Sequence, residues 1–359
     1  MVSPRMERMQ KRKERVNAND TYQGIQYETT IKETEMDCEI INDDDIKTSD
    51  VEIQCELPVQ QKYSIENFKH DRKAVNYYTG FSSYEHFMYL FYCLGPAAHD
   101  LNYKCATLDP TDQLFLTLMK LRCAKEDLEL SLFFKISETT VSKIIVTWIN
   151  FLFYQLGELD IWSSREVVDN NMPTDFKRKF PSTRVLLDAT EFPIQKPSDV
   201  NLQSASWSSY KHRNTVKAMI GCTPRGTISY VSDVFAGSAS DRQIIEQSTL
   251  LSDTSLFKKG DSIMADRGIM VQDLFATRDV KVNTPTMLKG KSQLEPVEII
   301  HDRRVASKRI HIERVIGLSK TFKILKKELP HNKLHLSNRI VKVCFYLSNF
   351  KNVIVDKYA

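Results

Sequence analysis

The chain has 359 residues, of which 42% are hydrophobic and 27% charged, a composition that predicts one large globular domain with a smaller one. No stretch contains the roughly eighteen uncharged apolar residues that a membrane span needs, and the charged N-terminus excludes a secretory signal, so we expect a soluble intracellular protein. The seven cysteines stand singly, without a CxxC pair, which excludes a zinc knuckle and predicts free thiols.

Residues 1–75 are polar and sustain no apolar period, so we predict a disordered arm there. The arm holds 12 Lys and Arg against 16 Asp and Glu, which leaves 38 against 30, a net +8, for the remainder. That excess suits a polyanionic partner, although many cytosolic enzymes share it. The arm begins with four basic residues that suit a nuclear import signal, a DNA-touching tail or a solvated charge run: Lys11, Arg12, Lys13 and Arg15.

Residues 76–160 predict an α-helical domain, because apolar residues recur there at helical intervals. Within it, the stretch 125–150 reads as two helices around a turn, with Ser137 as the N-cap of the second. In a helix-turn-helix the second helix enters the major groove of DNA. The side chains expected to face DNA are Glu138, Thr139, Thr140, Ser142 and Lys143, while Val141, Ile144 and Ile145 pack inward. A plain helical bundle is the alternative.

Residues 161–183 contain two prolines in a polar stretch and predict a linker. From residue 184 onward the pattern changes to short apolar strands alternating with helices, which predicts an α/β domain with a mixed sheet flanked by helices. Strands are expected at 185–187, 215–223, 226–235 and 262–265, and long helices around 306–325 and 336–355.

Three acids occupy informative places in this domain. Asp188 ends the first predicted strand, Asp266 ends a later one, and Glu313 lies on a helix beyond. Strand ends of one sheet can lie side by side, and a packed helix can add one more side chain. Carboxylate oxygens prefer Mg²⁺ or Mn²⁺, and two such ions can promote phosphodiester cleavage. The pattern therefore predicts a two-metal site on three carboxylates.

Four ordered motifs resemble the DDE superfamily endonucleases, in particular the transposases of the PIF/Harbinger group and their bacterial insertion-sequence relatives. The motifs are VLLDATEFPIQKP at 185–197, VFAGSASDRQI at 234–244, SIMADRGI at 262–269 and RIHIERVIG at 309–317. Upstream, the stretch LTLMKLRCAKEDLELSLFFKISETTVSKII is similar to the helix-turn-helix that precedes the catalytic domain in this group. The resemblance covers residues 80–355 and implies an RNase H-like catalytic domain over 184–359.

The resemblance implies that Asp188, Asp266 and Glu313 form the catalytic and metal-binding triad, with two Mg²⁺ or Mn²⁺ ions per site. Asp241, in the segment GSASD, competes for the second place, but it stands where a helix would begin and looks like its N-cap. We therefore prefer Asp266. Thr190 and Glu191 are expected to shape the loop after the first acid.

Several basic residues are candidates for DNA contact, each with a surface salt bridge or an ordinary exposed loop as its alternative. Arg267 and Arg314 adjoin the acids, and Lys211, His212 and Arg213 follow Trp207 and Tyr210, a mixture that suits gripping a DNA end. His311 and His335 are read as non-ligands.

The chain departs from the group in two ways. Ile269 stands where relatives commonly have an aromatic residue, and the N-terminus lacks the array of cysteine and histidine of a zinc-coordinating module. The resemblance then implies that recognition of transposon ends is reduced, lost with a truncation, or supplied by an accessory DNA-binding protein. DNA and a second copy of the chain are the other expected partners, and the nucleus the expected compartment.

Three functions compete at this point. The first is an active transposase that cuts transposon ends and joins them to target DNA. The second is a domesticated, catalytically inactive DNA-binding nuclear protein, and the third is an RNase H-like nuclease or resolvase that cuts without strand transfer. The intact acids favour the first, and the helix-turn-helix disfavours the third.

Overall fold

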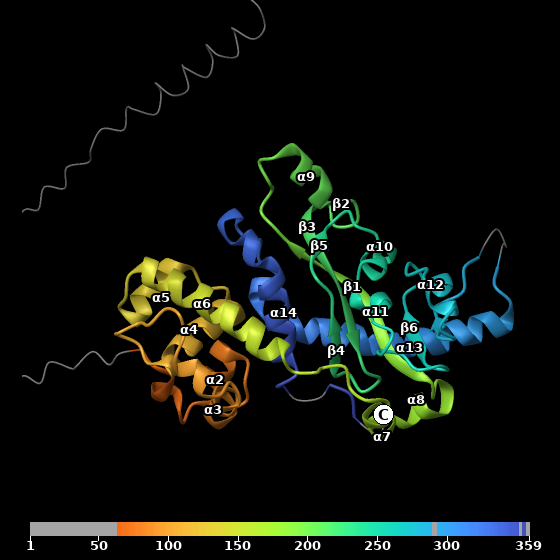
Figure 1. Ribbon diagram of the computed structural model, residues 1–359, viewed down its shortest axis with the longest axis horizontal. Helices are drawn as coiled ribbons and strands as arrows, with labels where there is room; N and C mark the ends of the chain where they lie inside the picture. Colours follow the sequence, from red (N-terminus) through yellow and green to blue (C-terminus); the bar gives the residue numbers. More distant parts are fainter. Residues whose placement is uncertain (1–62, 289–292, 352–353, 357–359) are drawn as a thin grey trace, which may run out of the picture. The chain divides into compact units, whose positions relative to one another are not determined.

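The computed structural model describes residues 63–288, 293–351 and 354–356 (Figure 1). The basic run at residues 11–15 and most of the predicted arm lie outside these residues. Within the described ranges, no helix is both long enough and apolar enough to cross a membrane.

The boundary predicted at residue 75 is wrong, because residues 63–75 are part of the fold. They form the 3-10 helix η1 (Ile65–Phe68) and the start of α2 (Arg72–Thr79), with Ile65 and Val75 fully buried. The Ser64 hydroxyl and the Ile65 amide both donate to Asp112 Oδ1, at 2.8 and 3.0 Å. Isolated apolar residues in a polar stretch give no periodic signal, so the sequence pattern misses this anchor.

The predicted helical domain is confirmed by a series of helices around one central helix. Its further elements are α3 (Tyr84–Cys93), η2 (Pro96–His99), α4 (Pro110–Cys123), α5 (Asp127–Phe134) and α6 (Glu138–Gly157). The α4 helix is buried on all sides, because every residue from 112 to 119 is shielded from solvent. Such a helix must be surrounded by others, and α2 and α6 both pack against it.

The two helices predicted within residues 125–150 are α5 and α6. The chain leaves α5 through Lys135 in a left-handed conformation (φ 53°) and enters α6 after Ser137, whose hydroxyl accepts from the Thr140 amide at 3.1 Å. Val141, Ile144 and Ile145 are buried as expected. The helix continues to Gly157, and its second half packs against α14 (Ser337–Ser348) in a shared core (Figure 1).

The segment predicted as a linker, residues 161–183, folds instead into two short helices. They are α7 (Arg165–Asn171) and α8 (Thr174–Lys179), with Val168 and Phe176 buried. Arg165 pairs with Asp261 at 3.0 Å, and Asp175 pairs with Lys308 at 2.5 Å. Prolines and polar residues suggested an open connection, but these distant ion-pair partners hold the segment on the fold.

A mixed sheet forms the centre of the C-terminal region, as the RNase H-like prediction requires. The strands are β1 (Thr183–Pro193), β2 (Trp207–Ser208), β3 (Arg213–Cys222), β4 (Ile228–Val231), β5 (Phe235–Ala236), β6 (Ser262–Ala265) and β7 (Lys281–Asn283). Their order is β2-β3-β1-β6-β7, with β4 and β5 also paired to β3. The β1 strand is antiparallel to β3 and parallel to β6, which is parallel to β7.

Helices cover both faces of this sheet. The remaining elements are α9 (Val200–Ser206), α10 (Asp241–Glu246), α11 (Thr249–Ser252), α12 (Gln272–Ala276), α13 (Pro296–Ser319), η3 (Lys323–Leu325) and η4 (His331–Leu336). Val185 and Leu187 pack into the core beneath α10 to α12, whereas Leu186 packs into the core shared with α13 and α14. Because strand side chains alternate, Asp188 lies on the same face as Leu186, toward α13.

Candidate active site and nucleic-acid interface

Asp188 and Asp266 stand at corresponding places on two neighbouring parallel strands. Leu187 of β1 pairs with Ala265 of β6 in register, and each acid is the next residue along its strand. Because parallel strands run in the same direction, both acids follow the end of the paired segment at the same edge of the sheet. The geometry thus brings the predicted first and second acids to one place.

The β1 strand continues beyond Asp188, which corrects the expectation that this acid ends its strand. Residues 188–193 remain paired with β3 after the pairing with β6 has stopped. Thr190 and Glu191 therefore lie within the strand and shape no loop. Thr190 is buried, and Glu191 Oε2 accepts from the Thr215 hydroxyl at 2.8 Å. The sequence suggested that the strand ends at Asp188 because the apolar run stops at Leu187. The strand continues because pairing with β3 needs only backbone groups.

Asp188 lies in an unfavourable environment for a negative charge. Burial raises its pKa to about 6, the nearby Arg309 guanidinium opposes this rise, and the charges of Asp266, Asp241 and Glu313 add to it. These three acids therefore lie close enough to act on Asp188 electrostatically. We call Asp188, Asp266, Glu313 and Asp241 the acidic group, because the charges of the other three act on Asp188, and which of them hold metal stays a prediction.

Glu313 lies on the exposed face of α13, and it follows Arg309 by one helical turn. Arg309 Nη1 forms an ion pair with Asp266 Oδ1 at 2.9 Å, so the same helix contributes both an acid and a cation to the group. His311, on another side of α13, is buried with Nδ1 2.8 Å from the Pro224 carbonyl oxygen.

Asp241 is not the N-cap of its helix, as the sequence suggested. Ser240 has that role, because its hydroxyl accepts from the Gln243 amide at 3.1 Å, and Asp241 is the first residue of α10. Asp241 Oδ1 pairs with Lys217 Nζ at 2.6 Å. Its Oδ2 lies 4.0 Å from where a Cβ on Gly268 would stand, so Asp241 adjoins the loop after Asp266.

The donor chemistry of this acidic group suits a hard divalent cation, because all of its members are carboxylates. As the side chains stand in the described part of the chain, however, no three His, Cys, Asp or Glu residues are arranged to hold a metal ion. Asp266 and Asp241 are each paired with an internal cation, Arg309 or Lys217. Each ion pair uses one carboxylate oxygen, Oδ1, of its acid.

Lys320, the C-cap of α13, is a neighbour that the sequence reading missed. Its Nζ donates to the Glu191 carbonyl oxygen at 3.1 Å and lies 5.3 Å from the centre of the Phe192 ring. Burial and the charge of Lys211 lower its pKa to about 8, against the opposing charges of Asp188 and Glu191. Arg309, Glu313 and Lys320 are separated by four and then by seven residues, a spacing that places them on one face of a helix. This spacing is the sequence signal that could have identified Lys320.

The basic and aromatic segment 207–213, which we call the loop although its ends pair as β2 and the start of β3, presents exposed side chains. Tyr210 is 79% exposed, and Lys211 Nζ stacks over its ring at 4.1 Å from the centre. Lys211, His212 and Arg213 are all exposed, and His212 adopts a left-handed φ of 51°. Lys211 lies near enough to Lys320 to lower its pKa, so the loop reaches toward the acidic group.

The other predicted DNA contacts are open to solvent. Arg314 is exposed, and Arg267 is exposed with Nη2 at 3.8 Å from Asp302 Oδ2. On the start of α6, Thr139 and Lys143 are exposed and Ser142 is half-buried. Lys143 Nζ lies 5.5 Å from the centre of the Tyr103 ring. These positions leave the side chains accessible, and their contact with DNA stays a prediction.

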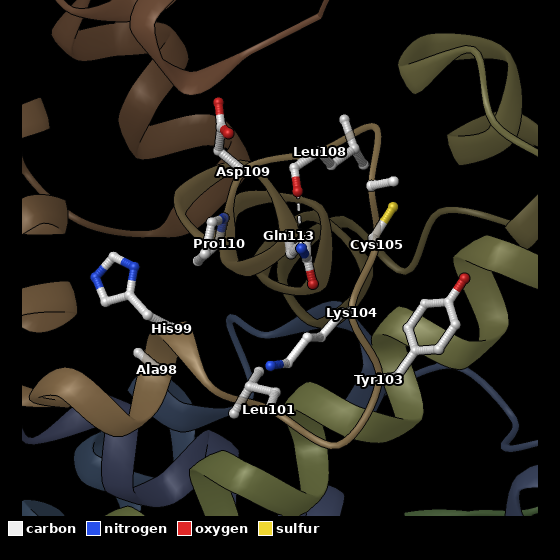
Figure 2. A pocket seen from close by; sticks show the side chains of 11 residues that line it. Ala98, His99, Leu101, Tyr103, Lys104, Cys105, Leu108, Asp109, Pro110 and Gln113 are labelled. Carbon is white, nitrogen blue, oxygen red and sulfur yellow. Dashed lines mark hydrogen bonds between the residues drawn. The ribbon is translucent and has the colours of Figure 1, made fainter.

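The helical region also contains a small hollow of about 190 Å³, lined in part by His99, Lys104 and Gln113 (Figure 2). Gln113 donates to the Leu108 carbonyl oxygen at 2.8 Å and accepts from the buried Trp148 indole at 3.2 Å. Lys104 pairs with Asp100 at 2.8 Å. The lining of this hollow includes none of the four acids of the acidic group.

Comparison with known families identifies both regions. Residues 187–349 match the family model of the DDE superfamily endonuclease, and residues 106–158 match the helix-turn-helix of DDE superfamily endonuclease. The C-terminal region is therefore similar to DDE superfamily endonucleases, and the helices before it are similar to the helix-turn-helix of that superfamily. No curated protein matches the chain.

Proposed function

We propose that this protein is a DDE-type DNA transposase of the PIF/Harbinger group, which cuts phosphodiester bonds at transposon ends and transfers the freed strand to target DNA. The observation that carries the proposal is the register of β1 and β6, which sets Asp188 beside Asp266 and within electrostatic reach of Glu313. The match to the endonuclease family supports the reaction class.

In this proposal, Asp188, Asp266 and Glu313 hold two Mg²⁺ or Mn²⁺ ions. Bound there, the ions would activate an attacking oxygen and stabilise the leaving one in an in-line displacement. Asp188 must be ionised to take this role, and Arg309 favours its ionised form. Arg309 holds Asp266 in an ion pair, and its guanidinium would be able to contact a DNA phosphate if a cation took its place on that carboxylate. The charge of Asp188 acts on Lys320, which would offer a second cation near the phosphate backbone.

The DNA would be held at two places. The start of α6 would enter the major groove with Thr139, Ser142 and Lys143, as the helix-turn-helix match supports. Near the acidic group, Lys211, His212, Arg213, Arg267 and Arg314 would neutralise phosphates. The proposal includes nuclear localisation, a homodimer and an accessory DNA-binding protein for recognition of transposon ends. The basic run at 11–15 supports the nuclear compartment.

One observation favours a second candidate, a domesticated DNA-binding protein without catalysis. The second acid and its alternative are both neutralised by internal cations, Arg309 and Lys217. Such pairing would stabilise an acidic group that no longer binds metal, because opposite charges relieve the repulsion between carboxylates.

Cleavage and strand-transfer assays distinguish the two candidates. Purified protein is incubated with labelled DNA that carries the ends of the element and with supercoiled target plasmid, in Mg²⁺, in Mn²⁺ and with chelator. The transposase requires metal-dependent nicks and joined products that are absent from Asp188→Asn. Folded protein that binds this DNA and cuts in neither metal would establish the domesticated candidate, and cutting without joining would indicate a nuclease.

A further inference from the structure

Arg242 of α10 contacts the loop that follows Asp266 and the start of α12. Its Nη1 donates to the Met270 carbonyl oxygen at 2.9 Å and to Asp273 Oδ1 at 2.8 Å, while Nη2 donates to Asp273 Oδ2 at 2.7 Å. Its Nε donates to Glu246 Oε1 at 2.8 Å, one turn further along α10. The guanidinium is thus fixed on its own helix, and it is bound by one hydrogen bond to the loop and by two to the first turn of α12.

We propose that Arg242 is a positioning residue, which holds residues 266–273, the loop after β6 together with the start of α12, so that Asp266 stays beside Asp188. The inference rests on the proposed function, because only there does Asp266 have a catalytic role. The contacts of Arg242 do not depend on that function. Arg242 touches neither acid and acts through the backbone at Met270 and through the first turn of α12.

The loop is short and is held at both ends by different helices. Asp266 itself pairs with Arg309 of α13, and Arg267 faces Asp302 of the same helix. At the other end, Ile269 and Val271 are buried beneath α10 to α12, while the exposed Met270 between them offers its carbonyl oxygen to Arg242. The Ile269 amide donates to the Asp266 carbonyl oxygen at 3.0 Å, so the two ends are coupled through one turn.

The energetic role of Arg242 lies in orientation more than in global stability. The side chains of Arg242 and Asp273 are 40% and 64% exposed, and exposed ion pairs contribute little to folding. A bidentate arginine nevertheless fixes direction and distance together, which a lysine cannot reproduce with its single charged nitrogen. Loss of Arg242 should therefore loosen the loop while the protein stays folded.

The same arrangement explains the segment GSASDRQI in structural terms. Ser240 caps α10, Asp241 pairs with Lys217 of β3, and Arg242 binds the loop after β6. Three consecutive residues thus join one helix to two parts of the sheet that lie far apart in the sequence. The segment connects these parts, whether or not Asp241 also binds a cation.

The test compares Arg242→Gln, Arg242→Lys and Asp273→Asn with Arg278→Gln as a matched control. Arg278 donates to the carbonyl oxygens of Asp253 and Leu251 and does not touch the loop. Hydrogen exchange of the amides at 267–272 is measured on the full chain without metal, and Mn²⁺ affinity is measured by titration of the metal alone.

Faster exchange confined to the loop is expected in Arg242→Gln, with smaller effects in Arg242→Lys and Asp273→Asn and none in the control. Mn²⁺ binding should weaken by about tenfold in Arg242→Gln, as for other residues that orient metal ligands. Unchanged loop exchange in Arg242→Gln would overturn the positioning role, as would faster exchange with unchanged Mn²⁺ affinity. Wild-type protein that binds no Mn²⁺ would instead count against the proposed function, and loop exchange would still decide whether Arg242 holds the loop.

Discussion

Arg309 of α13 forms an ion pair with Asp266 of the β6 edge, with 2.9 Å between Nη1 and Oδ1. The two residues are 43 positions apart, and Glu313 follows Arg309 by one turn on the same helix. A cation therefore already lies at the place where we propose a metal pair. Its presence explains how carboxylates can gather in the metal-free protein, and it leads to predictions about charge at this edge.

The first prediction concerns Asp266→Asn. The variant should lose metal-dependent DNA cleavage, because Asn keeps the size of Asp but lacks the charge that holds a cation. Its melting temperature should change little, since the lost ion pair is half-exposed and contributes about 0–1 kcal/mol. Cleavage is measured on labelled DNA beside Asp279→Asn, which removes an exposed aspartate paired with Lys259. Full activity in Asp266→Asn would show that Asp266 is not the second acid.

The second prediction concerns pH and Asp188. Its folded pKa, about 6, lies above the ordinary 3.8, so its contribution to stability is fully present below pH 3.8 and is lost as pH rises through 6. Asp188→Asn should therefore gain stability relative to wild type between pH 4 and pH 8, by up to about 3 kcal/mol. Urea unfolding without metal at both pH values measures this gain. A difference that does not vary with pH would contradict it.

The same shift predicts the pH dependence of the reaction. Because a protonated Asp188 cannot hold a cation, cleavage at limiting Mn²⁺ should fall as pH drops below about 6. Saturating Mn²⁺ should move this decline to lower pH, since metal competes with the proton. A rate profile that is flat from pH 7 to pH 5 at limiting metal would exclude Asp188 as a ligand.

The third prediction concerns the loop at 207–213. Replacing Lys211, His212 and Arg213 together by alanine should weaken DNA binding and flatten its dependence on salt. Each lost phosphate contact lowers the slope of log affinity against log salt by roughly 0.9. A variant of Lys258 and Lys259, two basic residues before β6, serves as the control and should keep the wild-type slope. Equal slopes for both variants would remove the loop from the DNA interface.

The fourth prediction concerns the cap of α6. Ser137→Ala should cost about 1 kcal/mol of stability, because the Thr140 amide loses its acceptor. Ser83→Ala removes a similar cap from α3, outside the helix-turn-helix pair, and should cost a similar amount. Only Ser137→Ala should also weaken DNA binding, measured by fluorescence anisotropy under conditions where both variants are folded. Equal DNA affinity in the two variants would argue against α6 as the reading helix.

Local patterns in the sequence determined much of this protein. The short apolar runs at 185–187 and 262–265 predicted two strands followed by acids, and the placement of Ser137 predicted the start of α6. These features depend on the period of the chain and on neighbouring residues, which a single sequence contains. The mixed sheet, its flanking helices and the helix-turn-helix followed from them.

Only the tertiary structure decided which residues surround the acids. The ion pairs of Asp266 with Arg309 and Asp241 with Lys217, and the hold of Arg242 on residues 266–273, join segments that are 24 to 43 residues apart. The helices within 161–183 likewise depend on Asp261 and Lys308, far along the chain. The sequence around a charged residue does not identify its ion-pair partner. Electrostatic attraction acts through space, and its strength depends on burial, which the fold alone determines.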